Sequence, residues 1–217
     1  MPRTHEAQDA LFRAVESGDP IAVEAAVRAG ASLNERGLSG ETALTYAVNS
    51  ELAPEACASL VRTLLALGAQ VKAEGTGGPL GTSVHKASRF GYVEALSLLL
   101  RADGAAALSK FNDLGHDPLI SAVVENKEAC VLVLLDAGSP VDGRDESSNS
   151  HAALGYAVQS RNATMTELLL RHGANPSAPG WMGLTPIQLA MPDGCDDADT
   201  CEKIRAMLRR AQEGRGQ

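Results

Sequence analysis

The sequence predicts an all-α solenoid, because three features recur along its 217 residues. A six-residue apolar phrase returns at intervals of 33, 40, 35, 35 and 33 residues. A second apolar run with helical spacing follows each phrase, and a polar, turn-rich stretch precedes most phrases. A period near ~33 residues is typical of solenoids, whose units bury their apolar faces only by stacking on their neighbours. We therefore expect one elongated domain of stacked helix-turn-helix units with projecting hairpin loops.

The recurring phrases are expected to form the first helix of each unit. Along the chain they read Asp9-Ala-Leu-Phe-Arg-Ala, Thr42-Ala-Leu-Thr-Tyr-Ala, Thr82-Ser-Val-His-Lys-Ala, Asp117-Pro-Leu-Ile-Ser-Ala, Ala152-Ala-Leu-Gly-Tyr-Ala and Thr185-Pro-Ile-Gln-Leu-Ala. Thr or Asp opens five of the six, and both side chains accept hydrogen bonds from the free amide groups at a helix start. Asp9 opens the first unit, which we expect to be an N-terminal cap.

A second helix is expected after each phrase. The apolar runs that predict these helices span residues 21–28, 56–67, 93–101, 128–136, 165–172 and 202–210. A glycine closes each of the first five, namely Gly30, Gly68, Gly104, Gly138 and Gly173. Glycine adopts the left-handed conformation that ends many helices. The sixth helix has only one apolar face and therefore predicts a C-terminal cap.

These phrases resemble the ankyrin-repeat family, whose signature is Thr-Pro-Leu-His-x-Ala. The best matches are the phrases that open at Thr82, Asp117 and Thr185, and the second family phrase matches Glu167-Leu-Leu-Leu-Arg-His-Gly-Ala-Asn175. The resemblance covers residues 6–211 and implies a single ankyrin-repeat domain with short tails at 1–5 and 212–217. The units it implies are about 6–36, 37–73, 74–111, 112–144, 145–179 and 180–211.

Composition limits the partners and the location. The formal charge of −8 opposes binding to nucleic acid, which requires clustered Lys and Arg. No stretch approaches the ~18 to 20 apolar residues of a membrane span, and the N-terminus lacks the apolar core of a secretory signal. Cys57, Cys130, Cys195 and Cys201 are too few and too scattered for a disulfide framework, which fits a reducing compartment. We expect a cytoplasmic monomer, with a nuclear location left open.

Two segments are candidates for a phosphate-binding or metal-binding site. The glycine-rich stretch 75–81 precedes a helix, but the Gly-Lys-Ser/Thr sequence of a phosphate-binding loop is missing. The acidic loop 193–200 contains Asp193 and Cys195, yet it completes neither a calcium nor a zinc pattern. We expect no cofactor, and metal binding by the acidic loop stays open.

The histidines are expected to be structural. His85 occupies the signature histidine position, where the resemblance implies a hydrogen bond toward the adjacent loop. His116 and His151 fall in hairpins and are expected to be exposed. No Ser or Cys can be placed beside a His and an acid with a defined geometry, so we expect no catalytic residue and no enzyme. Cys130 lies in an apolar helix and is expected in the core.

In the ankyrin family, the hairpin tips and the exposed face of the first helix form a concave surface that contacts partners. The resemblance places on it Arg36, Ser39, Asn49, Ser50, Leu80, Lys110, Asp113 and Ser160, together with the partner-binding candidates Leu38, Glu41, Arg89, Phe90, Leu114, His116, Glu125, Gln159, Trp181, Met182 and Leu184. Trp181 is the only tryptophan. It is either an interface anchor or a packing residue over the last two units.

The predicted function is a non-enzymatic interaction module, acting as an adaptor, scaffold or inhibitor. Repeats and caps account for nearly every residue, so no segment is left for a catalytic domain. The acidic balance favours a basic patch on the protein partner. An alternative is a regulatory subunit or an effector or immunity-type protein that occludes a single enzyme.

Overall fold

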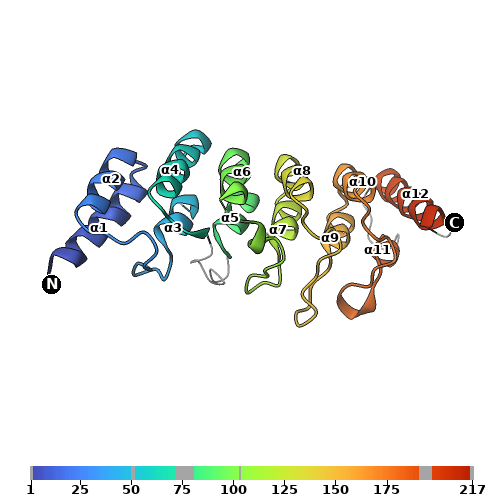
Figure 1. The fold of residues 1–217 in the computed structure, drawn as a ribbon. Helices are drawn as coiled ribbons and strands as arrows, with labels where there is room; N and C mark the ends of the chain where they lie inside the picture. Colours follow the sequence, from blue (N-terminus) through green and yellow to red (C-terminus); the bar gives the residue numbers. More distant parts are fainter. Residues whose placement is uncertain (1, 50–51, 72–80, 103, 191–196, 216–217) are drawn as a thin grey trace.

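The described part of the chain folds into a row of helix pairs without strands (Figure 1). The computed structural model describes residues 2–49, 52–71, 81–102, 104–190 and 197–215. Its helices are α1 (Pro2–Glu16), α2 (Pro20–Arg28), α3 (Ala43–Asn49), α4 (Pro54–Ala66), α5 (Ser83–Phe90), α6 (Val93–Arg101), α7 (Pro118–Val124), α8 (Glu128–Asp136), α9 (Ala153–Gln159), α10 (Ala163–Arg171), α11 (Pro186–Leu189) and α12 (Ala198–Arg215), with 3-10 turns η3 (Gly104–Ala107) and η4 (Trp181–Gly183).

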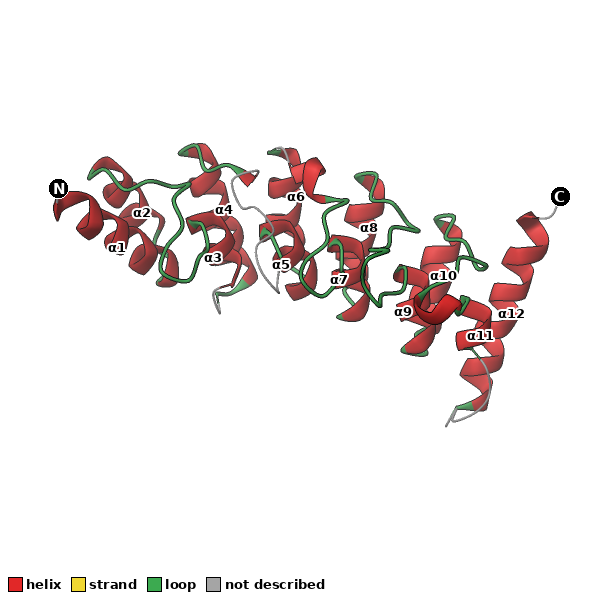
Figure 2. Cartoon of the chain, turned by 90° about the horizontal axis from the view of Figure 1, so that it is seen from below, coloured by secondary structure: helices red, strands yellow, loops and turns green. Residues whose placement is uncertain are grey.

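The helices form two layers, with the odd-numbered helices in an inner layer and the even-numbered helices in an outer layer (Figures 1 and 2). Each inner helix packs on the outer helix that follows it, and neighbouring inner helices contact one another from α1 to α11. The hairpin loops project from the inner layer on one side of the molecule (Figure 1). This arrangement confirms the predicted solenoid.

The recurring phrase supplies the core of the inner layer. Its third position is at most 1% exposed in the first five units, at Leu11, Leu44, Val84, Leu119 and Leu154. The alanine that closes each phrase is also buried in all six units, which lets adjacent helices approach closely. Burial of these positions explains the period in the sequence.

Helix α1 departs from the prediction. Asp9 was expected to start this helix, but α1 begins at Pro2 and contains 15 residues, against 7 in α3. The proposed tail 1–5 is therefore largely helical, and Asp9 lies in the middle of the helix. At the other end, α12 continues to Arg215, with Cys201, Ile204 and Leu208 buried on one face.

Polar caps and glycines set the other helix ends. Asp117 accepts a hydrogen bond from the Ile120 amide at 2.7 Å, and Thr82 forms a capping box with His85. Four of the five predicted terminating glycines have positive φ angles, at Gly30, Gly68, Gly138 and Gly173. Gly104 instead begins η3, two residues after the C-cap of α6.

Candidate functional site

Three hairpin tips share one backbone geometry. In segments 37–41, 112–116 and 180–184, the first amide donates to the fifth carbonyl at 2.8 to 2.9 Å, and the fourth amide donates to the first carbonyl at 2.9 to 3.0 Å. The fourth residue is a glycine with φ between +72° and +77° in each tip. These bonds close the loops on themselves, so the tips hold their side chains on a defined backbone.

The tips expose apolar side chains where solvent favours polar ones. Leu38 is 107% exposed, Leu114 is 51% exposed and Met182 is 76% exposed. Trp181 and Leu184 keep 43% and 36% of their surface accessible. The predicted candidates at these positions therefore form a spaced series of exposed apolar side chains at the hairpin tips.

Met182 adopts an unfavourable backbone conformation at its tip. Its φ of +58° lies in the left-handed region, and the following Gly183 also has a positive φ. A side chain with a Cβ in this region costs on the order of 1 to 3 kcal/mol. The closed tip holds this conformation and directs a flexible thioether side chain into solvent beside Trp181.

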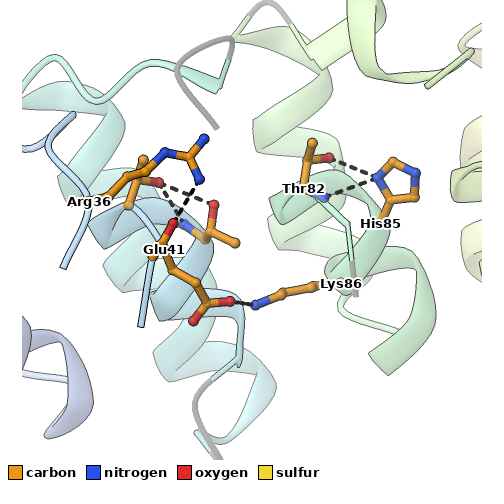
Figure 3. Close-up of polar contacts among 8 residues, drawn as sticks. Arg36, Glu41, Thr82, His85 and Lys86 are labelled. Atoms are coloured by element: carbon orange, nitrogen blue, oxygen red, sulfur yellow. Dashed lines mark hydrogen bonds and ion pairs between the residues drawn. The ribbon is translucent and has the colours of Figure 1, made fainter. Parts of the chain in front are cut away.

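Glu41 lies at the fifth position of its tip and contacts the next unit. Its carboxylate forms an ion pair with the ammonium group of Lys86 in α5 (Figure 3). The Lys86 side chain is 0% exposed and the Glu41 side chain is 16% exposed. Most of the Glu41 surface is therefore engaged within the solenoid. Glu41 was predicted to lie on the binding surface, and its ion pair with Lys86 was not predicted.

His116 occupies the same tip position two units later and also contacts the unit that follows its own. Its Nε2 lies 3.2 Å from the Tyr156 hydroxyl, and the two rings meet edge to face at 5.1 Å. Burial, together with the positive charge of Arg89, lowers the pKa of His116. The expected exposure of His116 is wrong, because the Tyr156 ring covers part of it.

His151 is buried, contrary to prediction, with 4% of its surface exposed. The signature histidine position of its unit is Gly155, and a Cβ there would lie 2.7 Å from the His151 Cβ. His151 thus fills the space that a signature histidine would occupy. Its Nδ1 faces Gly180 in the next hairpin and has no hydrogen-bond partner in the described residues.

The hydrogen bonds of His85 confirm its predicted structural role, and Figure 3 shows those that join it to Thr82. Its Nδ1 accepts from the Thr82 amide at 3.2 Å, so the proton resides on Nε2, which donates to the Lys110 carbonyl at 3.0 Å. Burial lowers the pKa of His85 to about 4. The neutral imidazole therefore links the start of α5 to the next hairpin.

The helix ends of the inner layer carry the other polar candidates. Arg89 and Glu125, from α5 and from the end of α7, form an ion pair at 2.9 Å with about a third of each side chain exposed. Phe90 is 37% exposed and packs against Tyr92, and Gln159 is exposed at the end of α9. The ends of the inner helices thus expose both apolar and charged side chains.

Asp117 is buried under the following hairpin. One carboxylate oxygen caps α7, while Oδ2 has no hydrogen-bond partner in the described residues and faces Gly143. Burial raises the pKa of this carboxyl group to about 7, although hydrogen bonds from the Ile120 and Leu119 amides oppose the change. The capping role of Asp117 was predicted from the sequence, whereas its buried second oxygen was not.

A groove of about 790 Å³ lies at the N-terminal end of the molecule. Its walls are residues 5–16 of α1 and residues 35–39 of the first hairpin, and Tyr46 of α3 adds to its lining. The sequence predicted the hairpin side of this groove. The α1 side was not predicted, because none of the predicted surface residues lies before Arg36.

The metal prediction falls mostly outside the described residues, which omit 191–196. In the remainder, no cluster of three or more His, Cys, Asp or Glu side chains could hold a metal ion. Cys57 and Cys130 are free and buried, as predicted for Cys130, and burial raises the pKa of both thiols to about 11. Cys201 is disulfide-bonded, which differs from the reduced state expected of the cysteines.

Two further predicted segments lie partly outside the described residues. The glycine-rich stretch is described only at Gly81, and the surface candidates Ser50 and Leu80 are not described. Across the described ranges, no helix has the length and apolar character needed to cross a membrane.

The paired helices, stacked layers and repeated tips define a helical-repeat protein. No family model matches the chain. The chain is 33% identical over 117 residues to the nuclear factor NF-kappa-B p105 subunit of Mus musculus, covering 52% of this chain and 12% of that relative. It spans between a tenth and a third of the length of the first curated relatives it matches.

Solved structures cover almost the whole solenoid. The ankyrin repeat domain of Bcl-3, described as a member of the IkappaB protein family, has a TM-score of 0.75 at 27% identity, over 93% of this chain and 85% of that domain. An ankyrin repeat domain from Acinetobacter baumannii AYE has a TM-score of 0.76 at 25% identity, over 93% and 97%. The chain is an ankyrin-repeat protein, and these similarities indicate a protein-interaction module.

Proposed function

We propose that this chain is a non-enzymatic module that binds a protein partner through its hairpin tips and the exposed ends of its inner helices. The observation that carries the proposal is the series of exposed apolar side chains at closed tips, at Leu38, Leu114, Trp181 and Met182. Because these tips lie on one side of the solenoid, a single partner surface can contact several of them (Figure 1).

The energetics favour hairpin 180–184 as the anchor of this surface. Trp181 combines a large apolar ring with partial exposure, and buried tryptophans at interfaces contribute ~2 kcal/mol or more on truncation. Met182 adds a flexible side chain that adapts to an apolar partner. The closed backbone of the tip lowers the conformational entropy lost on binding.

Charge completes the proposed interface. The chain carries a formal charge of −8, so a partner with a basic patch associates faster and in a preferred orientation. Arg89 and Glu125 add an ion pair in which about a third of each side chain is exposed and available to a partner. We propose that the chain acts as a monomeric adaptor, scaffold or inhibitor in the cytoplasm or nucleus, without binding nucleic acid or membrane.

Capture of a partner by the tagged chain tests this proposal. We expect Trp181→Ala to weaken capture at least tenfold and Phe90→Ala to weaken it several-fold, at unchanged stability. Ile21→Ala is the matched control, because Ile21 is 76% exposed on outer helix α2. Unchanged capture by both Trp181→Ala and Phe90→Ala would show that the surface is wrongly assigned.

The stability of the captured complex tests the alternative, a subunit that occludes one enzyme. A stoichiometric complex that survives size exclusion and removes the partner's activity supports that role. Rapid exchange between partners supports an adaptor. Both roles use the same proposed binding surface, so the comparison of Trp181→Ala with the parent chain tests either role.

A further inference from the structure

The unusual length of α1 extends the N-terminal groove. This helix has 15 residues, whereas the inner helices α3, α7 and α9 have 7 each. Eight extra residues lengthen a helix by about 12 Å. Figure 1 shows the N-terminal half of α1 extending past the inner layer to the level of the hairpin tips. The inner helix of the first unit thus faces the first hairpin across an open groove.

An aromatic pair lies in this groove. The rings of Phe12 and Tyr46 meet edge to face with their centroids 5.6 Å apart, and both side chains are partly exposed. A Cβ at Gly37 would lie 2.7 Å from the Phe12 ring, so the hairpin backbone rests directly on this ring. Leu38 extends from the same tip and is fully exposed. The groove therefore has an aromatic floor and an apolar rim.

The charges around the floor are mainly available as acceptors. Asp9, Glu16 and Glu35 line the groove and are exposed, and their carboxylates have no ion pair or hydrogen bond within the described part of the chain. Of the two arginines in the lining, Arg13 donates to the Asp9 carbonyl at 3.3 Å and Arg36 to the Gly40 carbonyl at 2.7 Å. The lining therefore carries three carboxylates and two guanidinium groups, a net charge of −1, and the carboxylates beside the aromatic rings can still pair with a cationic ligand.

We propose that the N-terminal groove binds a peptide segment of a protein partner in which one apolar side chain is flanked by Lys or Arg residues. The apolar side chain packs on Phe12, Tyr46 and Leu38, and the cationic groups reach Asp9, Glu16 and Glu35. The volume of about 790 Å³ accommodates one large side chain and its neighbours. This inference rests on the proposed interaction function and assigns it a second contact region, distinct from the tip at Trp181.

Three synthetic peptides test the groove against the ¹⁵N-labelled chain at physiological salt. The probe is acetyl-Gly-Arg-Lys-Leu-Arg-Lys-Gly-amide. One control peptide replaces all four cationic residues by Glu, and the other replaces the Leu by Ser. We expect the probe to shift the amide resonances of residues 5–16 and 35–46 and to saturate. The acidic control should cause no shifts, and the Ser control should bind several-fold more weakly.

Charge-reversal variants separate the groove from net charge. Asp9→Lys with Glu35→Lys should weaken probe binding at least tenfold, and Leu38→Ser should weaken it several-fold. Glu24→Lys with Asp136→Lys is the matched control, because it changes the net charge equally at exposed positions of outer helices α2 and α8. Its affinity for the probe should stay within twofold of that of the unmodified chain.

Several results would overturn the proposal. Equal weakening by both double variants means that only net charge attracts the probe, and absence of saturable shifts at the groove means that no peptide site exists there. Dimerisation in sedimentation that Asp9→Lys with Glu35→Lys abolishes means that the groove holds a second copy. Partner capture that depends on Trp181 but not on the groove variants overturns this inference alone and leaves the proposed function intact.

Discussion

Lys86 and Glu41 join the second and third units through an ion pair that is almost completely shielded from solvent (Figure 3). Glu41 precedes the phrase of its unit, and Lys86 occupies the fifth position of the next phrase. His116 and Tyr156 have the same relationship between the fourth and fifth units. The residue before each of these phrases therefore contacts the following unit, which couples neighbouring units through polar side chains.

Removal of one partner from this pair should destabilise the protein. We expect Glu41→Gln to lower the free energy of unfolding by about 3 kcal/mol, because Lys86 is left charged without a counterion in a buried position. Urea denaturation measures the change. The double variant Glu41→Leu with Lys86→Met should recover most of the loss, since well-packed apolar residues replace buried ion pairs at little cost. A loss in the double variant equal to that in Glu41→Gln would contradict this account.

Asp117 should make stability fall as pH rises. Its pKa is raised from 3.8 to about 7 by burial, so between pH 4 and pH 7 the folded state holds a proton that the unfolded state has released. The contribution is thus fully present below the unfolded pKa and is lost as pH rises toward 7, by about 1 kcal/mol per pH unit in the middle of that window.

The variant Asp117→Asn tests this dependence. Asn keeps an oxygen for the Ile120 amide and stays neutral at every pH, so the variant should be more stable than the parent at pH 8 and similar to it at pH 4. Urea denaturation at pH 4, 5, 6, 7 and 8 gives the free energy of unfolding against pH for the parent and for the variant. Parallel curves for the two proteins would rule out Asp117 as the titrating group.

Gly155 should not tolerate a larger residue while His151 is present. A Cβ at Gly155 would lie 2.7 Å from the His151 Cβ, so Gly155→Ala should destabilise the chain by about 1 to 3 kcal/mol through overpacking. In a His151→Ala background, the same change should be neutral or stabilising, because Ala favours the helix over Gly. Thermal unfolding of the parent, the two single variants and the double variant gives the coupling free energy between positions 151 and 155. Additive effects would show that the two positions do not compete for space.

The stability that is lost when a leucine is truncated to alanine should depend mainly on how deeply that leucine is buried. Leu119 is 0% exposed in α7, and Leu119→Ala should lower the free energy of unfolding by about 2 to 5 kcal/mol. Leu114 lies in the preceding tip and is 51% exposed, so Leu114→Ala should change stability by less than about 0.5 kcal/mol. Urea unfolding of both variants compares them directly. Similar losses for the two would contradict the predicted core.

The sequence-based prediction agrees best with the structure at positions that are buried in every unit. The phrase positions Leu44, Val84 and Leu119 were recognisable because each faces the same neighbours in every unit. Prediction was weaker at α1, where Asp9 looked like a cap although the helix already began at Pro2. It was also wrong for His151, because the missing side chain at Gly155 creates a space that becomes visible only when the hairpin is placed over the helix.

The sequence by itself determined the repeat, the helix pairs and most helix ends, because these depend on apolar periodicity and on local capping chemistry. Only the tertiary structure decided how the polar residues between the phrases are used. Glu41 pairs with Lys86 across 45 residues, and His116 reaches Tyr156 across 40. The N-terminal groove likewise needs α1 and the first hairpin to face each other. Such contacts depend on the stacking of units in space, which local sequence patterns do not encode.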